Sequence, residues 1–317
     1  MNLILKVCFG LFIASAILMD STLSFAKSSD KNSTNESLKN GSPPPEFLEM
    51  SKKVLNKDQF LRKWLDVSYA KDSKSQVLDV YLPDTGNGPF PVLVVIHGGG
   101  WEMGDKSDFQ VITIIESAVA RGYAVASINY RLSGEAIFPS QIYDVKAAIR
   151  FLKANTNEYS LNPEKFAAWG NSAGGHLAAL VGTSEGVSSL EDLRMGNSNQ
   201  SSRVNAVVTW FGEFELSKTD FSPPLKKLFG GNPELVKLAD VNKYITKDDP
   251  PFLIQHGSSD DIAPVTQSVQ FATDLYKVLG KDKVTLDILL GEPHGGSRFE
   301  APENIEKVFS FLDSVLK

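Results

Sequence analysis

Residues 165–182 read KFAAWGNSAGGHLAALVG, and this stretch decides the fold. Lys165–Gly170 is predicted to be a strand and Ser172–Gly182 a helix, with the G-x-S-x-G motif of residues 170–174 at the turn between them. At such a turn the glycines avoid side-chain clashes, the serine is exposed, and the N–H groups of the following helix point toward it. The context favours a serine nucleophile at Ser172 over a plain glycine-serine turn.

Short apolar strands alternate with helical patterns along most of the chain. The predicted strands are Gln76–Leu82, Pro91–Ile96, Tyr123–Asn129, Lys165–Gly170, Val204–Phe211, Pro251–His256 and Val284–Leu290. The predicted helices are Phe109–Arg121, Pro139–Asn155, Ser172–Gly182, Thr266–Leu279 and Glu303–Leu316. This alternation predicts an α/β fold, with a mostly parallel central sheet covered by helices on both faces. Ligands of such folds bind beyond the carboxyl ends of the strands. Two polar insertions, 184–202 and 213–249, are either a small cap over the site or surface loops.

The first 26 residues resemble an export signal. Lys6 precedes an apolar run, Val7–Met19, and Ser24 and Ala26 place small residues at the two positions that a signal peptidase reads. We therefore expect a signal peptide at 1–26, a disordered linker at 27–45 and a catalytic domain at 46–317, in a secreted or periplasmic protein. An uncleaved membrane anchor is the alternative.

Bulk composition limits the partners and cofactors that we expect. The 317 residues carry a net charge of −6, which does not favour nucleic acid as a partner. The only cysteine, Cys8, lies within the signal, and the four histidines are scattered, so we expect neither a disulfide nor a metal site. We expect no cofactor and no stable membrane insertion after processing. The oligomeric state is left open.

A second glycine-rich motif follows the strand Pro91–Ile96. Residues 97–101 read HGGGW, and three glycines expose backbone N–H groups to a ligand. Together with the N–H of Ala173, they can bind the oxyanion of a tetrahedral intermediate. A phosphate-binding turn is the alternative, but a helix directly afterwards or G-x-G-x-x-G spacing would then be expected. Trp101 is either a wall of the substrate pocket or a packing aromatic.

A serine nucleophile needs a histidine base. His97 belongs to the glycine motif, and His176 lies on the helix that follows Ser172. Serine, acid and histidine follow in that order along chains with this motif, so only His256 and His294 come late enough. Only His294 leaves room for an acid before it, and we therefore predict His294 as the base.

The acid that orients this histidine is expected in the turn of residues 256–264, HGSSDDIAP. Asp260 and Asp261 both qualify, and one of them can instead cap a helix. Tyr130, Arg131 and Asp144 are interpreted as a structural ion pair or cap, because buried charges need partners, and a role in substrate binding is the alternative.

Several motifs together resemble the bifunctional feruloyl and acetyl-xylan esterase-like branch of the α/β-hydrolases, which neighbours the hormone-sensitive-lipase-like esterases. The resemblance runs from about Val67 to the C-terminus and includes Tyr81–Pro83, His97–Trp101, Gly104–Lys106, Asn129–Ser133, Asp144–Arg150 and Trp169–His176. It implies an α/β-hydrolase fold and a carboxylic ester hydrolase that forms an acyl-enzyme on a short-chain, acetyl or aryl ester. The ester is expected on a small molecule or a polysaccharide.

The resemblance also assigns residues. Ser172 matches the family nucleophile and His294 the base, and the pattern H-G-x-x-D-x-x-V-P selects Asp260 over Asp261, although Ala263 replaces its valine. The second and third glycines of the HGGGW motif, Gly99 and Gly100, match the oxyanion donors, and Asn171 stands where the lipase-like neighbours have Asp. A serine peptidase or amidase with the same triad, and a non-catalytic binding protein on this scaffold, remain as alternatives.

Overall fold

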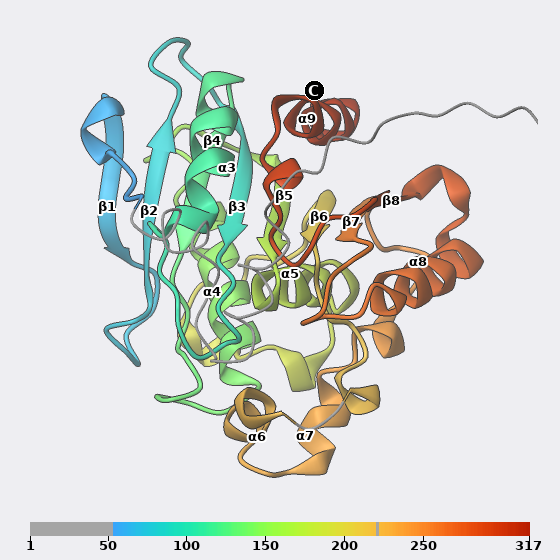
Figure 1. Ribbon diagram of the computed structural model, residues 1–317. Helices are drawn as coiled ribbons and strands as arrows, with labels where there is room; N and C mark the ends of the chain where they lie inside the picture. Colours follow the sequence, from blue (N-terminus) through green and yellow to red (C-terminus); the bar gives the residue numbers. More distant parts are fainter. Residues whose placement is uncertain (1–52, 220–221) are drawn as a thin grey trace, which may run out of the picture. The chain divides into compact units, whose positions relative to one another are not determined.

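Eight strands form one sheet in the computed structural model, which describes residues 53–219 and 222–317 (Figure 1). Their order is β1-β2-β4-β3-β5-β6-β7-β8. The six strands β4, β3, β5, β6, β7 and β8 are parallel to one another. At one edge of the sheet, β2 pairs antiparallel with β4, and β1 pairs antiparallel with β2. The bounds are β1 Arg62–Ser68, β2 Val77–Leu82, β3 Phe90–Ile96, β4 Ala124–Ile128, β5 Leu161–Asn171, β6 Ala206–Trp210, β7 Phe252–Gly257 and β8 Val284–Leu289. The predicted, mostly parallel α/β fold is confirmed.

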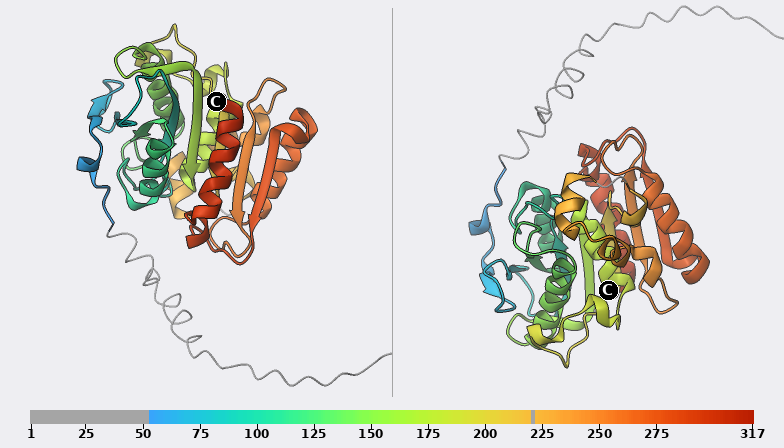
Figure 2. Two further views of the ribbon diagram at one scale, coloured as in Figure 1. Left: turned by 90° about the horizontal axis from the view of Figure 1, so that it is seen from above. Right: turned by 90° about the horizontal axis from the view of Figure 1, so that it is seen from below.

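Helices cover both faces of this sheet (Figure 2). The longer helices are α3 Phe109–Ala120, α4 Ser140–Ala154, α5 Ala173–Thr183, α8 Thr266–Leu279 and α9 Pro302–Leu316. Successive strand residues point to opposite faces, so Val92 and Val94 of β3 pack with α4, α5 and α8, whereas Leu93 and Val95 pack with α3 and α9. The continuous apolar run of β3 is therefore explained by burial on both sides.

The strand β1 was not predicted from the sequence. Its burial does not alternate regularly, and its register with β2 shifts between Trp64 and Val67. Asp66, inside this irregularity, has a φ of 54°, which is uncommon for a residue other than glycine. A bulge of this kind interrupts the two-residue period by which a strand is recognised.

The predicted ion pair between Arg131 and Asp144 is confirmed. Asp144, buried on α4, accepts from the Arg131 backbone N–H at 2.8 Å and from its guanidinium Nη2 at 2.8 Å. Gln76 donates to the same carboxylate at 2.8 Å. The pair thereby joins α4 to the loop after β4 and satisfies a buried charge.

The two polar insertions lie in different places. Residues 184–202 contain the short 3-10 helices η2 Ser188–Leu190 and η3 Leu193–Met195, and Glu191 of this segment pairs with Arg150 of α4. Residues 213–249 contain η4 Leu216–Lys218, α6 Pro223–Phe229, α7 Pro233–Leu238 and η5 Val241–Tyr244.

The second insertion lies against the HGGGW motif and the segments that follow it. A Cβ atom on Gly100 would lie 3.9 Å from Pro224 Cβ of α6, and Lys227 of the same helix pairs with Glu102 at 2.5 Å. The Leu228 carbonyl accepts from the Phe138 N–H at 2.8 Å. The second insertion thus lies beside the glycine motif, as the cap interpretation requires of it.

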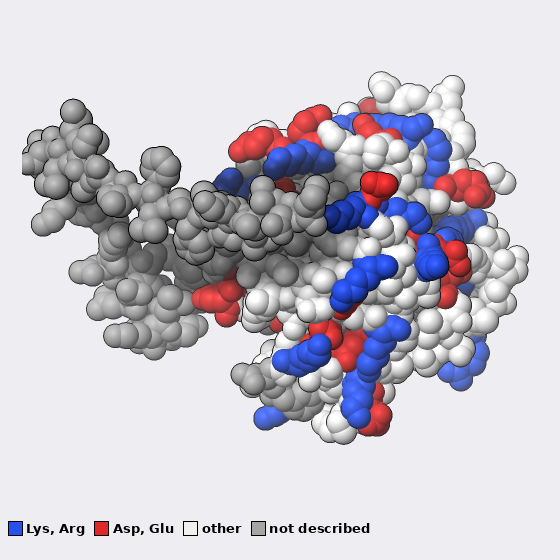
Figure 3. Space-filling model, turned by 90° about the vertical axis from the view of Figure 1, so that its right-hand side faces the viewer, with Lys and Arg blue, Asp and Glu red and all other residues white. Residues whose placement is uncertain are grey.

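Charges of both signs are interspersed on the face at the β8 end of the sheet (Figure 3). Many of them form short-range pairs, such as Lys277 with Asp274 at 2.8 Å and Lys307 with Asp287 at 3.2 Å. Pairs this exposed contribute little to stability.

The predicted signal peptide, the linker and the first residues of the predicted catalytic domain lie outside the described residues. Within the described ranges, no helix is long and apolar enough to span a bilayer.

Candidate active site

Ser172 occupies a strained turn between β5 and α5. Its φ of 51° and ψ of −122° lie in a region that non-glycine residues rarely adopt, and its N–H donates to the Trp210 carbonyl at 2.9 Å. Gly170 and Gly174, two residues before and two residues after Ser172, make the turn possible. A Cβ on Gly170 would lie 2.1 Å from the Gly174 carbonyl oxygen, and a Cβ on Gly174 would lie 2.1 Å from the Ile96 carbonyl oxygen.

Three side chains form a continuous hydrogen-bonded chain at this turn. His294 Nε2 lies 2.9 Å from Ser172 Oγ, and His294 Nδ1 lies 2.8 Å from Asp260 Oδ2. Asp260 follows β7 and His294 follows β8, so the carboxyl ends of three parallel strands bring them together. The geometry allows the imidazole to take a proton from the hydroxyl while the carboxylate holds the opposite nitrogen.

Asp260 is held on both carboxylate oxygens. Oδ1 accepts from the backbone N–H groups of Ile262 at 2.9 Å and Ala263 at 2.8 Å, and Oδ2 lies 3.1 Å from His256 Nε2. Burial alone would raise the pKa of Asp260, but hydrogen bonds from His256 and His294 outweigh it and hold that pKa well below its usual range. The carboxyl is therefore ionised at neutral pH. Asp261, by contrast, is exposed to solvent.

The HGGGW motif forms a tight turn beside Ser172. Gly99 has a φ of 104°, and a Cβ there would lie 2.2 Å from the Met103 carbonyl oxygen. A Cβ on Gly98 would lie 3.3 Å from Ser172 Cβ, which shows how near the turn is to the serine. Within the part of the chain that the structure describes, the N–H groups of Gly99, Gly100 and Ala173 donate to no acceptor. Three N–H groups are thus available close to Ser172.

Tyr130 supports this turn, a role that the sequence analysis missed. Its ring stacks on His97 with centroids 4.4 Å apart, and its hydroxyl donates to the His97 carbonyl at 3.0 Å. The interpretation of Tyr130 as part of the Arg131–Asp144 pair is therefore incomplete. The only signal in the sequence was its position directly after a strand that neighbours β3.

Trp101 packs in the interior. Only 4% of its surface is exposed, and its ring stands edge-on to His176 with centroids 5.3 Å apart. His176, on α5, has its Nε2 2.8 Å from the Ala239 carbonyl oxygen of the second insertion. Burial lowers the pKa of His176 to about 4, so this imidazole is neutral. The geometry favours the packing interpretation of Trp101 over a pocket wall.

Two residues after β6 also lie at the site and were not predicted. The Phe211 ring stands edge-on to His294 with centroids 4.6 Å apart. Burial raises the pKa of Glu213, two positions further on, and the charges of His294, Asp260 and His256 contribute less to it. Both follow the carboxyl end of a central parallel strand, and that position is the signal that could have found them.

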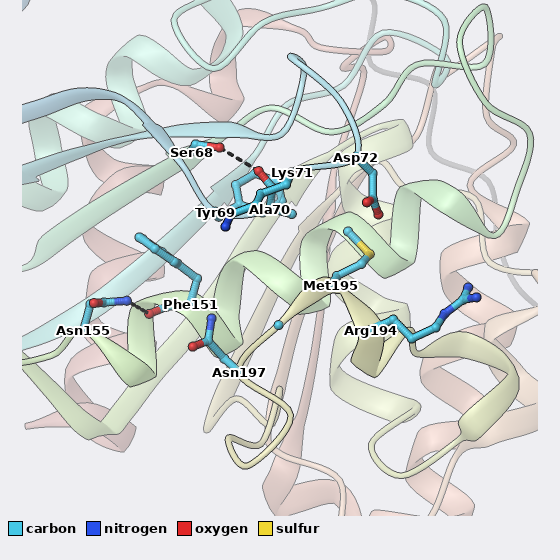
Figure 4. Close-up of a pocket in the computed structure, with 11 residues that line it drawn as sticks. Ser68, Tyr69, Ala70, Lys71, Asp72, Phe151, Asn155, Arg194, Met195 and Asn197 are labelled. Carbon is cyan, nitrogen blue, oxygen red and sulfur yellow. Dashed lines mark hydrogen bonds between the residues drawn. The ribbon is translucent and has the colours of Figure 1, made fainter.

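A separate pocket of about 450 Å³ lies between the loop Ser68–Asp72, the end of α4 and residues Arg194–Asn197 (Figure 4). Its lining includes none of the candidate triad residues. The Ser68 hydroxyl donates to the Ala70 carbonyl at 2.6 Å, and the Asn155 amide donates to the Phe151 carbonyl at 2.8 Å. Both donors are therefore already hydrogen-bonded to nearby backbone. Across the described ranges, no group of three or more His, Cys, Asp or Glu residues is arranged to hold a metal ion.

The parallel sheet, the strained serine turn and the ordered Ser172–His294–Asp260 chain define the α/β-hydrolase class. Within that class, residues 78–275 match the profile of the BD-FAE family. The chain belongs to the BD-FAE family.

Known esterases are similar to this chain in sequence and structure. Esterase LipC of Mycobacterium tuberculosis is 31% identical over 71% of the chain, which spans 58% of that relative. The chain spans about half of two other curated relatives, LipM and LipQ. A structure described as a truncated form of carbohydrate esterase from gut microbiota superposes with a TM-score of 0.76 and 32% identity, over 83% of this chain and 99% of that one. A bifunctional GH43-CE protein of Bacteroides eggerthii reaches 0.74 and 34%, over 80% of this chain and 35% of that one.

Proposed function

We propose that the protein is a serine carboxylic ester hydrolase that acts through an acyl-enzyme on a short-chain, acetyl or aryl ester. The observation that carries this proposal is the hydrogen-bonded chain from Ser172 Oγ through His294 to Asp260, with distances of 2.9 and 2.8 Å. Similarity to proteins named as esterases supports the choice of an ester bond.

In the first half-reaction Ser172 Oγ attacks the ester carbonyl carbon and its proton passes to His294 Nε2. The carbonyl oxygen becomes an oxyanion, which the N–H groups of Gly99, Gly100 and Ala173 bind. The C–O bond to the alcohol then breaks, and His294 returns the proton to the departing oxygen. Asp260 stays ionised and stabilises the imidazolium that forms between these two transfers.

In the second half-reaction a water molecule attacks the acyl-enzyme. His294 accepts one proton of this water, the same N–H groups bind the oxyanion, and Ser172 recovers its proton as the acid departs. Apart from this water, the groups that these steps use come from the chain's own residues.

A panel of activated substrates tests the proposal. The purified protein should hydrolyse p-nitrophenyl acetate at least 100-fold faster than p-nitroacetanilide, whose amide nitrogen is a poorer leaving group, and acetylated xylan and methyl ferulate should then separate acetyl from aryl substrates. Faster cleavage of the anilide would favour the peptidase or amidase alternative. Failure of a folded sample on all esters and on the anilide would favour a binding protein.

We also propose that the protein is exported and that its first 26 residues are removed. Support comes from the apolar run Val7–Met19 and the small residues Ser24 and Ala26. The mass of the protein from its native host should correspond to a chain that begins at Lys27. Full-length mass in the cytosolic fraction would contradict export, and full-length mass in the membrane fraction would favour an uncleaved anchor.

A further inference from the structure

The aromatic ring of Phe211 packs against the imidazole of His294. Their ring centroids are 4.6 Å apart, and the ring planes are inclined at 64°. The tip of the same ring lies near the backbone after the histidine, because a Cβ on Gly295 would lie 3.8 Å from Phe211 Cζ. Phe211 itself is buried. It therefore contacts the candidate base as well as the loop that carries this base.

The backbone of Phe211 adopts a conformation that is unfavourable for its side chain. The strand β6 ends at Trp210, and the φ of Phe211 is 40°. A positive φ is an outlier for a bulky residue, whereas glycine adopts it readily. The Phe211 N–H donates to the Gln255 carbonyl of β7 at 2.8 Å, which holds this conformation. Such strain persists only where surrounding contacts enforce it, and it clusters at functional sites.

A second ring and two buried amides hold Phe211 in place. The Phe299 ring packs against it with centroids 4.7 Å apart and an angle of 75° between the planes. The Phe299 carbonyl accepts from Asn304 Nδ2 at 2.9 Å, and Gln255 Nε2 donates to Asn304 Oδ1 at 2.6 Å. Gln255 thus bonds to Phe211 through its main chain and to the support of Phe299 through its side chain. The ring that packs on His294 is therefore fixed from β6, β7 and the start of α9.

Hydrogen bonds alone do not hold the imidazole of His294 through the whole reaction. Its Nε2 lies 2.9 Å from Ser172 Oγ, and its Nδ1 lies 2.8 Å from Asp260 Oδ2. Once His294 has taken the proton of Ser172 and turns it toward the departing alcohol, the contact with Asp260 remains as its fixed hydrogen bond. One hydrogen bond leaves a ring free to swing about it. A bulky ring packed against the imidazole removes that freedom, and a small displacement of a reacting group has a large effect on the rate.

We propose that Phe211 is a positioning residue, which keeps the His294 imidazole directed at Ser172 Oγ while His294 takes and returns the proton. The observations that carry this inference are the contact between the two rings and the positive φ at which the chain presents the ring of Phe211. The inference rests on the proposed ester hydrolase function and adds to it a residue outside the triad on which the base depends.

Two substitutions of Phe211 test this role by steady-state kinetics on p-nitrophenyl acetate. Phe211→Leu keeps an apolar side chain and removes the planar ring. We expect its kcat to fall by about 10- to 100-fold, because the base is misplaced in both half-reactions. Its KM should stay within about twofold, because the support is needed in the transition state and not for binding. Phe211→Tyr keeps the ring, and its kcat should lie within about threefold of wild type.

Proton NMR reports on the imidazole without any substrate. The Nδ1 proton that His294 donates to Asp260 should give a low-field resonance in wild type, assigned by its absence from His294→Ala. In Phe211→Leu this resonance should broaden, because a mobile imidazole exposes the proton to exchange with water. A role of Phe211 in packing alone would leave the resonance unchanged.

Phe309→Leu is a matched control for the loss of a buried ring. Phe309 belongs to the same hydrophobic cluster as Phe211, and its ring contacts Trp169 and Tyr123 rather than His294. The control should lower the unfolding temperature by an amount similar to that of Phe211→Leu. It should leave kcat and the low-field resonance unchanged.

A folded Phe211→Leu enzyme with the kcat of wild type would overturn the inference, as would a resonance as sharp as that of wild type. An equal loss of kcat in Phe211→Leu and Phe309→Leu would overturn it too, since the loss would then follow from a loosened core. The proposed function is judged on wild type alone. If a folded wild-type sample hydrolyses no p-nitrophenyl ester, that function fails, and the positioning role of Phe211 fails with it.

Discussion

His256 Nε2 lies 3.1 Å from Asp260 Oδ2, the same carboxylate oxygen that lies 2.8 Å from His294 Nδ1. The ring of His256 is fully buried and fixed by two further contacts, 2.7 Å from Nδ1 to Ser268 Oγ and 2.8 Å from Nε2 to the Ala263 carbonyl oxygen. One imidazole therefore positions the carboxylate that orients the other. Sequence reasoning considered His256 as a candidate base and as the start of the H-G-x-x-D pattern, but not as a partner of the Asp260 carboxylate.

We expect His256→Phe to lower kcat by roughly 10- to 100-fold, because it removes a donor to a charged acceptor. KM should change little, since His256 does not reach the serine. Steady-state kinetics on p-nitrophenyl acetate, with circular dichroism to check the fold, measures this. Ser268→Ala removes only the outer partner of His256 and should have a smaller effect. A folded His256→Phe enzyme with normal kcat would show that Asp260 needs no second imidazole.

Asp260→Asn and Asp261→Asn should differ strongly in activity. The first replaces the carboxylate that His294 contacts and should reduce kcat by about 10³- to 10⁴-fold. The second changes an exposed side chain and should stay within about twofold. Comparison of the two purified variants at one pH is sufficient, and the opposite ranking would mean that the acid is misassigned.

Gly99→Ala should disrupt the oxyanion turn. The added methyl would lie 2.2 Å from the Met103 carbonyl oxygen, so the turn must move, and loss of one donor typically costs about 10²- to 10³-fold in kcat. Gly122→Ala is a matched control, because Gly122 also has a positive φ, 87°, but no atom within 4 Å of the added carbon. The control should lose some stability and keep its kcat. Equal kcat in both variants would argue against the assigned turn.

The buried His176 should make stability depend on pH. Its pKa is lowered from 6.5 to about 4 in the folded protein, chiefly by burial, while hydrogen bonding to Ala239 and the charge of Asp240 oppose this. The unfolded chain therefore binds more protons between these pH values, and the free energy of unfolding should fall as the pH drops from about 6.5 to 4. The full effect is on the order of 3 kcal/mol.

Urea unfolding at pH 7, 5.5 and 4.5 measures this dependence. Other groups also titrate in this range, so the difference between wild type and His176→Gln isolates the contribution of His176. The variant should have the shallower pH dependence. Identical slopes in the two proteins would show that His176 is protonated equally in both states.

Local patterns were enough to predict much of the fold and part of the site. The Ser172 turn is encoded by adjacent residues, and the order of strands along the chain restricts the histidine to His294. The strand β1 could not be found in this way, because its bulge interrupts the alternation by which strands are recognised.

Side-chain direction at turns was harder to predict. Asp260 and Asp261 are chemically identical neighbours, and only the contacts of the first and the exposure of the second distinguish them, so residue chemistry alone left both open. Trp101 and Glu213 present the same difficulty. Burial of the Trp101 indole and partial burial of Glu213 depend on contacts between segments far apart in the sequence.

The proposed mechanism requires that Ser172 is a nucleophile activated by His294. Its most direct test is the intact mass of the protein after incubation with a fluorophosphonate, followed by peptide mapping. We expect one adduct per chain, on Ser172, with no adduct on a folded Ser172→Ala variant and much slower labelling of His294→Ala. Labelling that persists in Ser172→Ala, or a folded wild-type protein that gains no adduct, would contradict it.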